Sequence, residues 1–388
     1  MRILFIHQYF CPPEGYGNNR SYEIAKYWVE KGHKVTMLTS SAHFPSNHVA
    51  HKKNLHVEII DGIETYILNV PYSHYFSFTK RIWAFLSFYF KSYQLLKNIE
   101  KNDIIYASST PPSVGELGKV WSKKWDVPLI FETVDVWPDV PEQMKILKNQ
   151  WILKYLHTKV EQIYQHAHKI IALSPDMKKQ IMNHQVPEEK IIVSYNGTNI
   201  ETFYPLPKDN ATPKVIYAGS VGKVNDLSYF VKAAKALEDK AQFILLGNGN
   251  EASTIQKLVH KLHPKNFYWH TWVAKNKVHP YMASCDIGVS TIAHFKVLEA
   301  NSANKFYDYL ACGLPIVNNY EGWQKDFLIE NHCGFGSRLG NLKEFIDYLA
   351  YLIESPFLRK SMSIHARNAA VKNFDRKKLA LDLLNSFS

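Results

Sequence analysis

The chain has 388 residues, of which 46% are hydrophobic and 21% are charged. This length exceeds what one hydrophobic core usually organises, so we expect two domains, and the composition excludes an intrinsically disordered protein. The 46 Lys and Arg residues outnumber the 35 Asp and Glu residues, and the resulting formal charge of +11 favours anionic partners such as nucleotides or phospholipid surfaces.

The first half of the chain alternates strands and helices. Residues 3–6 form an apolar strand, residues 12–19 a loop that contains glycine, and residues 20–31 a helix with apolar side chains at helical spacing. The next strand, at residues 35–39, completes a βαβ unit of the kind that builds parallel sheets. His7 and Gln8 interrupt the first apolar run, which indicates a buried strand and not a signal peptide. Further strands are predicted at residues 57–60, 65–69, 103–107, 128–132 and 169–173.

A basic, aromatic segment interrupts this alternation. Residues 65–99 contain no Asp or Glu, and residues 75–97 are predicted to form a largely apolar helix. Its uninterrupted apolar part is about nine residues long, whereas a bilayer span needs roughly 20. Either this helix is buried in its domain, or one flank rests in the headgroup region of an anionic membrane surface. The one narrow polar or small stripe consists of Lys80, Ala84, Ser87, Lys91, Gln94 and Asn98.

The second half repeats the strand–loop–helix plan after a proline-rich linker at residues 203–214. We therefore expect an α/β fold with two doubly wound, Rossmann-like domains that face each other across a cleft, with ligands beyond the carboxyl ends of the strands. The expected domains are residues 1–203 and 204–371, and a C-terminal helix at about 372–388 is expected to pack back on the first domain. Predicted elements are strands at residues 214–219, 242–246, 267–270, 286–290 and 315–318 and a helix at residues 227–237.

Residues 302–315 predict a helix that begins at a Ser302 cap and stops at Gly313. Lys305 lies in its first turn, where the helix dipole makes a cation unfavourable unless an anion sits over that end. Arg20, at the start of the helix at residues 20–31, poses the same question. A phosphate contact is one reading for each of these cations, and an exposed, solvated side chain is the other.

With these residues placed, the chain resembles retaining, family-4 type glycosyltransferases with the GT-B fold. It is most similar to the bacterial subgroup that builds surface polysaccharides on lipid carriers, including aminodeoxysugar transferases. Each motif is weak alone, but their order and spacing along nearly the whole chain are specific. The resemblance is carried by Asn196-Gly197-Thr198 with Phe203-Tyr204-Pro205, residues 217–223, residues 246–251 and residues 302–315.

The resemblance implies that the second domain binds a nucleotide-sugar donor and the first domain binds the acceptor. Lys223 and Lys305 would neutralise the donor diphosphate, and Asp308 would accept hydrogen bonds from ribose hydroxyls. A loop with Gly15 and Gly17 would approach the diphosphate closely. The remaining donor-binding candidates are Ser220, Trp272, Val273, Glu299, Ser302 and Asn304.

The chain departs from the family pattern at three places. Ala300 stands where the first acid of the E-x7-E motif is expected, and whether the adjacent Glu299 replaces it stays open. The second acid is Asp308 in place of Glu. Ser220 and Asn225 stand where the family has Arg and Lys, and Lys223 is expected to take over their role.

The catalytic candidates are Asp135, Lys223 and Lys305. Asp135 belongs to residues 131–139, which resemble the subgroup's Asp-x-Trp-Pro element, and it either positions the acceptor or caps a turn. His7 and Arg20 complete the acceptor-binding set, although a buried core histidine is the alternative for His7. Because the chain has no Asp-x-Asp motif, we expect no metal and no cofactor at the reaction centre.

The expected activity is a retaining hexosyltransferase that uses a UDP-sugar and a lipid-linked, polyprenyl diphosphate acceptor in O-antigen or capsule synthesis. The scattered cysteines Cys11, Cys285, Cys312 and Cys333 indicate reduced thiols, so we expect a cytoplasmic protein, peripheral on the inner membrane face. Nucleic acid is not an expected partner, because the aromatic side chains gather on a helix and not along a groove. A nucleotide-sugar epimerase of the same fold and a non-enzymatic, basic membrane-binding protein are the alternatives. The sugar, the nucleotide, the acceptor linkage and the oligomeric state stay open.

Overall fold

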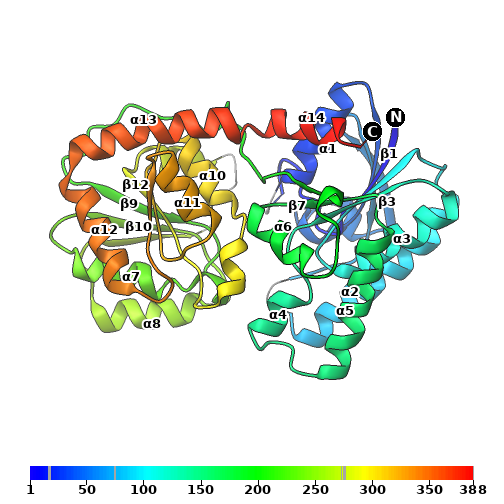
Figure 1. Cartoon of the computed structure of the whole chain (residues 1–388), viewed down its shortest axis with the longest axis horizontal. Coiled ribbons are helices and arrows are strands. Elements are labelled where there is room, and N and C mark those ends of the chain that lie inside the picture. The colour runs from blue at the N-terminus through cyan, green and yellow to red at the C-terminus, as the bar shows by residue number, and fades with distance from the viewer. Residues whose placement is uncertain (16–18, 74–75, 272, 274–276, 388) are drawn as a thin grey trace. The chain divides into compact units, whose positions relative to one another are not determined.

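The computed structural model describes residues 1–15, 19–73, 76–271, 273 and 277–387, and Figure 1 shows the course of the chain. The chain divides into two compact units. The N-terminal unit comprises Met1–Tyr195 together with Lys377–Ser388, and the C-terminal unit comprises Asn196–Arg376.

The N-terminal unit is built on an eight-stranded sheet of order β3-β4-β2-β1-β5-β6-β7-β8. Neighbouring strands are parallel except β3 and β4, which form a hairpin at the sheet edge. Asp61 and Gly62 join this hairpin with positive φ angles of 46° and 81°, as a two-residue turn of a twisted hairpin requires. The strands are β1 (Arg2–Ile6), β2 (Lys34–Ser40), β3 (Leu55–Ile60), β4 (Ile63–Leu68), β5 (Ile104–Ser108), β6 (Leu129–Thr133), β7 (Lys169–Ala172) and β8 (Ile191–Val193).

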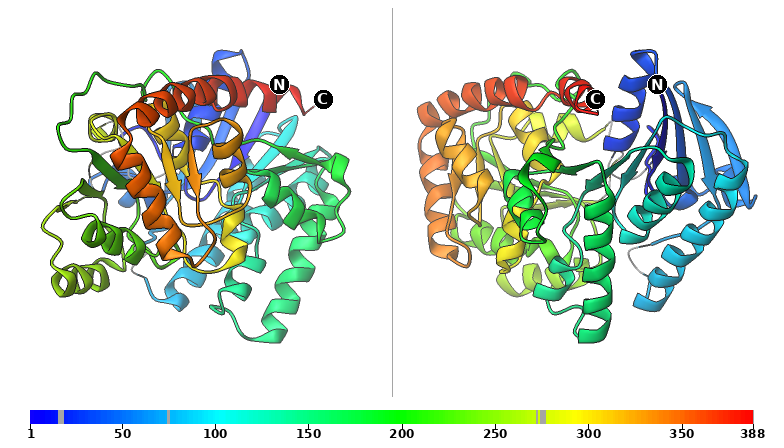
Figure 2. Two further views of the ribbon diagram at one scale, coloured as in Figure 1. Left: turned by 60° about the vertical axis from the view of Figure 1, so that its left-hand side comes forward. Right: turned by 45° about the vertical axis from the view of Figure 1, so that its right-hand side comes forward.

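Helices cover both faces of this sheet. On one face α1 (Arg20–Glu30) lies beside α14 (Arg376–Asn385) (Figure 2). Between these two helices Trp28 Nε1 donates a hydrogen bond to the Ala380 carbonyl at 2.8 Å. On the other face Gly115 and Gly118 let α3 (Pro112–Trp125) approach the sheet, because a Cβ at Gly115 would lie 2.6 Å from the Phe131 ring. Helices α2 (Phe78–Leu95) and α5 (Gln150–His166) both pack against α3. The two short helices are α4 (Asp139–Gln143) and α6 (Pro175–Met182).

The C-terminal unit contains a six-stranded, wholly parallel sheet of order β11-β10-β9-β12-β13-β14. The chain moves outward from β9 to β10 and β11 and then crosses back to β12, so the switch point of the topology lies between β9 and β12. Its strands are β9 (Lys214–Ala218), β10 (Gln242–Leu246), β11 (Phe267–His270), β12 (Ile287–Ser290), β13 (Ile316–Asn318) and β14 (Gly334–Gly336).

Helices α7 and α12 pack together against this second sheet, and α10 contacts β12, β13 and α13. The core between them is aliphatic and aromatic, with Phe230, Phe243 and Leu349 fully buried. The helices of this unit are α7 (Ser228–Ala236), α8 (Ala252–Leu262), α9 (Val278–Ala283), α10 (Asn304–Ala311), α11 (Trp323–Glu330), α12 (Leu342–Glu354) and α13 (Pro356–Asn373).

The α/β class and the two Rossmann-like sheets are confirmed. Strands β8 and β14, three residues each, were not predicted from the sequence. The predicted Ser302 cap is wrong, since α10 begins at Asn304 after the N-cap residue Ala303. The Ser302 hydroxyl instead lies 2.5 Å from the Tyr307 hydroxyl.

The expected boundary after residue 203 lies instead after Tyr195. The Thr198 N–H donates to the Phe374 carbonyl at 2.9 Å, and the Arg367 guanidinium donates to the carbonyls of Ile200 and Phe203. These hydrogen bonds tie residues 196–203 into the C-terminal unit.

Helix α2 is half-buried. It is therefore neither a wholly buried helix nor one whose position is set by an exposed flank alone. Phe88 and Ala84 face the core, whereas Trp83 is 73% exposed and Phe90 is 60% exposed. The narrow stripe of polar or small residues on this helix is partly buried, because small side chains such as that of Ala84 fit against the neighbouring elements. In the part of the chain that the structure describes, no helix combines the length and the apolar character that crossing a bilayer requires.

Candidate functional site

The carboxyl ends of β9 and β10 carry two loops that pack backbone against backbone. The Val221 N–H donates to the Asn248 carbonyl at 2.9 Å. A Cβ at Gly247 would lie 1.9 Å from the Gly219 carbonyl oxygen, and a Cβ at Gly249 would lie 2.3 Å from that of Val221. Only glycine permits this approach, so the glycines seen in the sequence build a firm floor at the switch point of the C-terminal sheet.

Lys305 lies across this floor from the first turn of α10. Its Nζ donates a hydrogen bond to the Tyr217 hydroxyl at 2.7 Å and stands 4.2 Å from the centre of the Tyr217 ring. The Tyr217 hydroxyl in turn donates to the Ser220 carbonyl at 3.0 Å. A Cβ at Gly219 would meet Lys305 Cε at 2.9 Å, so the glycine also makes room for the lysine. Tyr217, at the end of β9, is a site residue that the sequence analysis missed.

The surroundings of Lys305 favour a bound anion. Burial lowers the pKa of the Lys305 ammonium to about 7, and no carboxylate pairs with it among the residues that the structure describes. The N-cap residue Ala303 offers no side-chain hydrogen bond to α10, and the first turn holds no acidic residue. The positive end of the helix dipole and a half-buried ammonium group thus converge, and the part of the chain that the structure describes supplies no carboxylate to them. Phosphate groups bind to such an arrangement.

Next to Lys305, the side chain of Asn304 has an unmet hydrogen-bonding group. Its Oδ1 is enclosed and accepts no hydrogen bond from any described residue. A buried acceptor without a donor costs roughly 1–3 kcal/mol, so this oxygen is suited to a ligand hydroxyl. The backbone before it is fixed, because the Ser302 carbonyl accepts from the Asn196 side chain.

The other donor-binding candidates differ in how they are placed. Lys223 is exposed at the start of a short turn (Lys223–Asn225), and the Ser220 carbonyl accepts from Asn225 Nδ2 at 2.8 Å. Asp308 is only 1% exposed and accepts from Thr198 Oγ1 at 2.7 Å, so its carboxylate joins α10 to residue 198. Asp308 therefore has a structural contact, and its expected hydrogen bond with ribose hydroxyls stays a prediction.

The structure describes some of the other residues predicted to bind the donor and not the rest. Glu299 is half-buried in a short turn (Lys296–Ala300), while the neighbouring Ala300 is buried. Val273 is half-buried. Gly15 is buried, and its N–H donates to the Pro12 carbonyl at 2.9 Å. Gly17 and Trp272 lie outside the described residues.

In the N-terminal unit, Arg20 forms a buried ion pair with Glu132. Arg20 is 4% exposed, its Nη2 lies 2.9 Å from Glu132 Oε1, and its Nη1 donates to the Tyr195 carbonyl at 2.6 Å. Burial by itself would raise the pKa of Glu132, but Arg20 and hydrogen bonds from Ser108 and Tyr106 outweigh it and lower this pKa. Arg20 is therefore not the exposed, solvated cation that was one alternative, and it ties α1 to β6 and residues 194–195. Its contact with an acceptor phosphate stays a prediction.

His7 and Asp135 follow the carboxyl ends of β1 and β6. His7 Nδ1 lies 2.8 Å from Ser21 Oγ, and burial lowers the pKa of His7 to about 4, which leaves the ring neutral at pH 7. Asp135 is exposed and accepts from Thr110 Oγ1 at 3.3 Å. Partial desolvation by the surrounding protein raises the pKa of Asp135, and the Thr110 hydrogen bond opposes this rise. A carboxylate of raised pKa at a strand end is a candidate base.

Gln8 is a second candidate site residue that was not predicted from the sequence. It is fully buried just after β1, and neither Oε1 nor Nε2 has a hydrogen-bond partner among the described residues. Its own carbonyl accepts from Ser40 Oγ at 2.6 Å, which fixes the backbone. The available signal was a polar pair, His7-Gln8, directly after an apolar strand.

Comparisons with known proteins identify both halves of the chain. Residues 17–202 match the model of Glycosyltransferase Family 4, and residues 199–369 match the model of Glycosyl transferases group 1. A sucrose-phosphate synthase from Thermosynechococcus elongatus has the same fold, with a TM-score of 0.79 at 15% identity over 100% of this chain and 98% of the other. The two halves of the chain are thus similar to two glycosyltransferase domain families, and the chain has the GT-B fold.

Other similar proteins are also distant in sequence, at 13% to 24% identity. HepE of Anabaena, solved in complex with UDP-glucose, superposes with a TM-score of 0.72 at 15% identity over 100% of this chain and 99% of HepE. WaaG, a glycosyltransferase involved in lipopolysaccharide biosynthesis, superposes with a TM-score of 0.70 at 13% identity over 98% and 99%. An uncharacterized glycosyltransferase of Methanocaldococcus jannaschii is 24% identical over 243 residues, which span 60% of this chain and 61% of that protein.

A substitution at Gln8 should affect catalytic activity and the free energy of unfolding differently. Gln8→Met removes a buried polar group without partners, so we expect the free energy of unfolding to stay equal or rise by about 1 kcal/mol while catalytic activity falls. Urea denaturation and initial-rate kinetics measure the two effects. Ser92→Ala, which removes an equally buried and unpartnered hydroxyl from α2, is the matched control and should leave activity unchanged. Full activity in Gln8→Met would show that Gln8 only fills space.

Proposed function

We propose that the protein transfers a sugar, with retention of anomeric configuration, from a UDP-sugar to a lipid-linked saccharide in the synthesis of a surface polysaccharide such as O-antigen or capsule. The observation that carries this proposal is the half-buried Lys305 ammonium group at the switch point of the C-terminal sheet, which pairs with no carboxylate of the described residues. The UDP complex of HepE and the lipopolysaccharide role of WaaG support the choice of donor and pathway.

The C-terminal unit is the proposed donor-binding half. Lys305 and the start of α10 bind the diphosphate, and Lys223, three residues beyond Ser220, adds a second positive charge from solvent. Asn304 Oδ1 accepts a hydrogen bond from a hydroxyl of the donor. The glycine-rich floor at residues 219–222 and 247–249 lets the backbone approach the diphosphate without a side chain between them.

The chemical step breaks the bond between the anomeric carbon and the leaving phosphate oxygen. The acceptor oxygen then bonds to that carbon on the same face, and its proton passes to the departing phosphate. Negative charge grows on the diphosphate as an oxocarbenium-like sugar forms, so a fixed ammonium group stabilises the transition state more than the ground state. Asp135, in the N-terminal unit, is the proposed group that positions the acceptor hydroxyl.

This mechanism places no metal at the reaction centre. A divalent cation commonly neutralises a leaving diphosphate, and here two lysines and a helix N-terminus are proposed to do so. The chain contains no Asp-x-Asp motif that would hold such an ion.

The direct test is release of UDP. Purified protein should release UDP from a UDP-sugar in the presence of a lipid-linked acceptor without added divalent metal. Lys305→Ala should lower kcat/KM by at least about 10²-fold, since it removes the main charge opposite the leaving group. Lys343→Ala, which removes an equal charge from an exposed ion pair on α12, is the control and should keep the wild-type rate. Absence of UDP release, or a wild-type rate in Lys305→Ala, would contradict the proposal, and an altered sugar without acceptor would indicate an epimerase.

We further propose that the N-terminal unit binds the cytoplasmic face of an anionic membrane, where a lipid-linked acceptor resides. Helix α2 exposes Trp83, Leu86 and Phe90, at a spacing that places them along one helical face. Lys80 and Arg81 lie at the start of the same helix. Helix α5, which also contacts α3, exposes Trp151 (83%) and Tyr155 (61%). Exposed aromatic rings beside basic residues are typical of proteins that rest in the headgroup region.

Substitution on α2 tests this surface. The triple variant Trp83→Ser, Leu86→Ser and Phe90→Ser should stay folded and lose binding to vesicles that contain anionic phospholipids, because it removes exposed apolar area only. Co-sedimentation measures binding and circular dichroism measures folding. Phe88→Ser, on the buried side of the same helix, should instead destabilise the fold, by about 3–5 kcal/mol if it resembles other large-to-small core changes. Unchanged vesicle binding by the folded triple variant would remove α2 from this role.

A further inference from the structure

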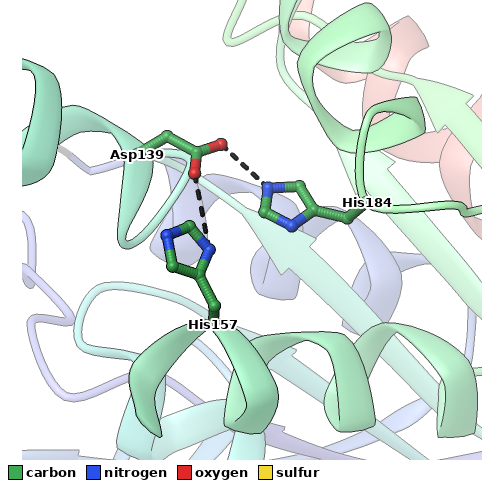
Figure 3. Close-up of side chains that lie close together, drawn as sticks. All are labelled: Asp139, His157 and His184. Atoms are coloured by element: carbon green, nitrogen blue, oxygen red, sulfur yellow. Dashed lines mark hydrogen bonds and ion pairs between the residues drawn. The ribbon is translucent and has the colours of Figure 1, made fainter. Parts of the chain in front are cut away.

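A cluster of two histidines and an aspartate lies in the N-terminal unit, on elements that the proposed donor chemistry does not use. Asp139 is the first residue of α4, His157 lies in α5, and His184 follows α6. Figure 3 shows the Asp139 carboxylate pointing between the two imidazole rings. One donor atom from each of the three side chains lies within 4.8 Å of the other two.

The contacts of Asp139 use one oxygen for each ring. Asp139 Oδ2 lies 2.8 Å from His184 Nε2, and Asp139 Oδ1 lies 3.8 Å from His157 Nδ1. The rings are stacked, with 5.7 Å between their centres and 28° between their planes. All three side chains are partly buried, so a bound ion would be shielded but reachable from solvent.

Each histidine also faces a carboxylate with its other ring nitrogen. His157 Nε2 lies 2.8 Å from Glu142 Oε2, and His184 Nδ1 lies 4.0 Å from Glu161 Oε1. Histidines that bind metals almost always direct their second nitrogen to a carboxylate or carbonyl, which fixes the ring and makes the first nitrogen a better ligand. His157 shows that outer arrangement through Glu142 at hydrogen-bond distance, and Glu161 faces the second nitrogen of His184 from 4.0 Å.

We propose that Asp139, His157 and His184 bind a zinc ion that is separate from the sugar-transfer site. Two imidazole nitrogens and one carboxylate oxygen form a zinc ligand set that leaves a fourth position for water, whereas Mg²⁺ and Ca²⁺ prefer oxygen ligands alone. Zinc ligands stand at about 2.0–2.1 Å from the ion and so roughly 3.3 Å from one another. Small side-chain rotations bring the three donor atoms to that spacing.

The ion would cross-link three segments of the chain next to the turn that carries Asp135. It joins α4, α5 and the segment after α6, which are distant in sequence. Asp135, the proposed acceptor-positioning residue, lies only four residues before Asp139. A zinc ion would therefore hold the turn that carries Asp135 against helix α5. The binding of zinc itself does not depend on the proposed function, because it can be measured without any substrate.

A second cluster, of two histidines and a glutamate, provides a control. His48 Nε2 lies 3.2 Å from Glu58 Oε1, and His56 Nε2 lies 3.3 Å from Glu58 Oε2. Among the described residues, this group does not bring three donor atoms within 4.8 Å of one another, as the Asp139 group does. We therefore expect His48→Gln and His56→Gln to change the histidine content of the protein without changing its zinc content.

The experiment uses the full chain without a histidine tag. After dialysis against chelator and back-titration with ZnCl₂ in competition with a chromophoric chelator, wild-type protein should bind one zinc ion per chain. His157→Gln and His184→Gln should lose that ion, and the two control variants should keep it. Glu142→Gln should weaken binding by about 10- to 100-fold, as the loss of an outer carboxylate does elsewhere. MgCl₂ at equal concentration should not compete.

Two further measurements keep the proposal testable if a variant misfolds. Co²⁺ in place of zinc should give wild-type protein the intense visible absorption of a tetrahedral nitrogen and oxygen site, without a thiolate band. Saturating zinc should raise the unfolding temperature of the wild-type N-terminal unit by roughly 5 °C or more, and MgCl₂ should not. Wild-type protein that binds no zinc, or a His184→Gln variant that retains its full equivalent, would overturn the proposal.

Discussion

A half-buried ammonium group that pairs with no carboxylate of the described residues is the constraint around which the C-terminal unit is organised. Lys305 is placed on the Tyr217 ring and hydroxyl, and burial alone lowers its pKa. Removing a charge from water is costly, so folding tolerates such a group where a ligand restores the lost interactions. A diphosphate supplies that anion, and its departure during glycosyl transfer is the step at which a fixed positive charge contributes most.

The rest of the C-terminal unit serves this arrangement. The switch point of the sheet places the loops after β9 and β12 next to each other, and α10 follows the second of them. Gly219 and Gly247 keep the floor free of side chains, while Asp308 anchors α10 through Thr198. The N-terminal unit uses a different solution for its buried cation, because Glu132 neutralises Arg20 within the fold. Lys305 is therefore the charge that we assign to ligand binding, and Arg20 is a charge that stabilises the fold.

The sequence predicts the fold well because its signals are local. Apolar runs, glycines after strands and the spacing of motifs indicate two Rossmann-like domains, and a lysine in a first helical turn indicates an anion site. Contacts between residues that are distant in the chain produce no local pattern in the sequence. Arg20 and Glu132 are 112 residues apart, so the sequence alone suggests an exposed cation where the structure has a buried pair. Tyr217 lies 88 residues from Lys305, and the sequence gives no reason to couple them.

The same limit applies to the Asp139, His157 and His184 cluster. Its members are spread over 46 residues, counted from Asp139 to His184, and lack the short spacing by which metal sites are recognised. Gln8 is an intermediate case, because its position after an apolar strand is visible in the sequence but its lack of partners is not. Burial and hydrogen-bond partners, which depend on the tertiary structure, distinguish functional from structural polar residues here.

The pH dependence of donor affinity tests the role of Lys305 most directly. With a pKa of about 7, the Lys305 side chain is charged below neutral pH and mostly neutral above it in the free protein. Burial raises the pKa of Tyr217, so this hydroxyl does not titrate in the same range. The Kd of a UDP-sugar, measured by calorimetry between about pH 6 and pH 8.5, should rise above pH 7 by up to about tenfold per pH unit. It should stay nearly constant in Lys305→Arg, whose guanidinium remains charged. Parallel pH profiles for the two proteins would contradict the assignment of Lys305 to the donor diphosphate.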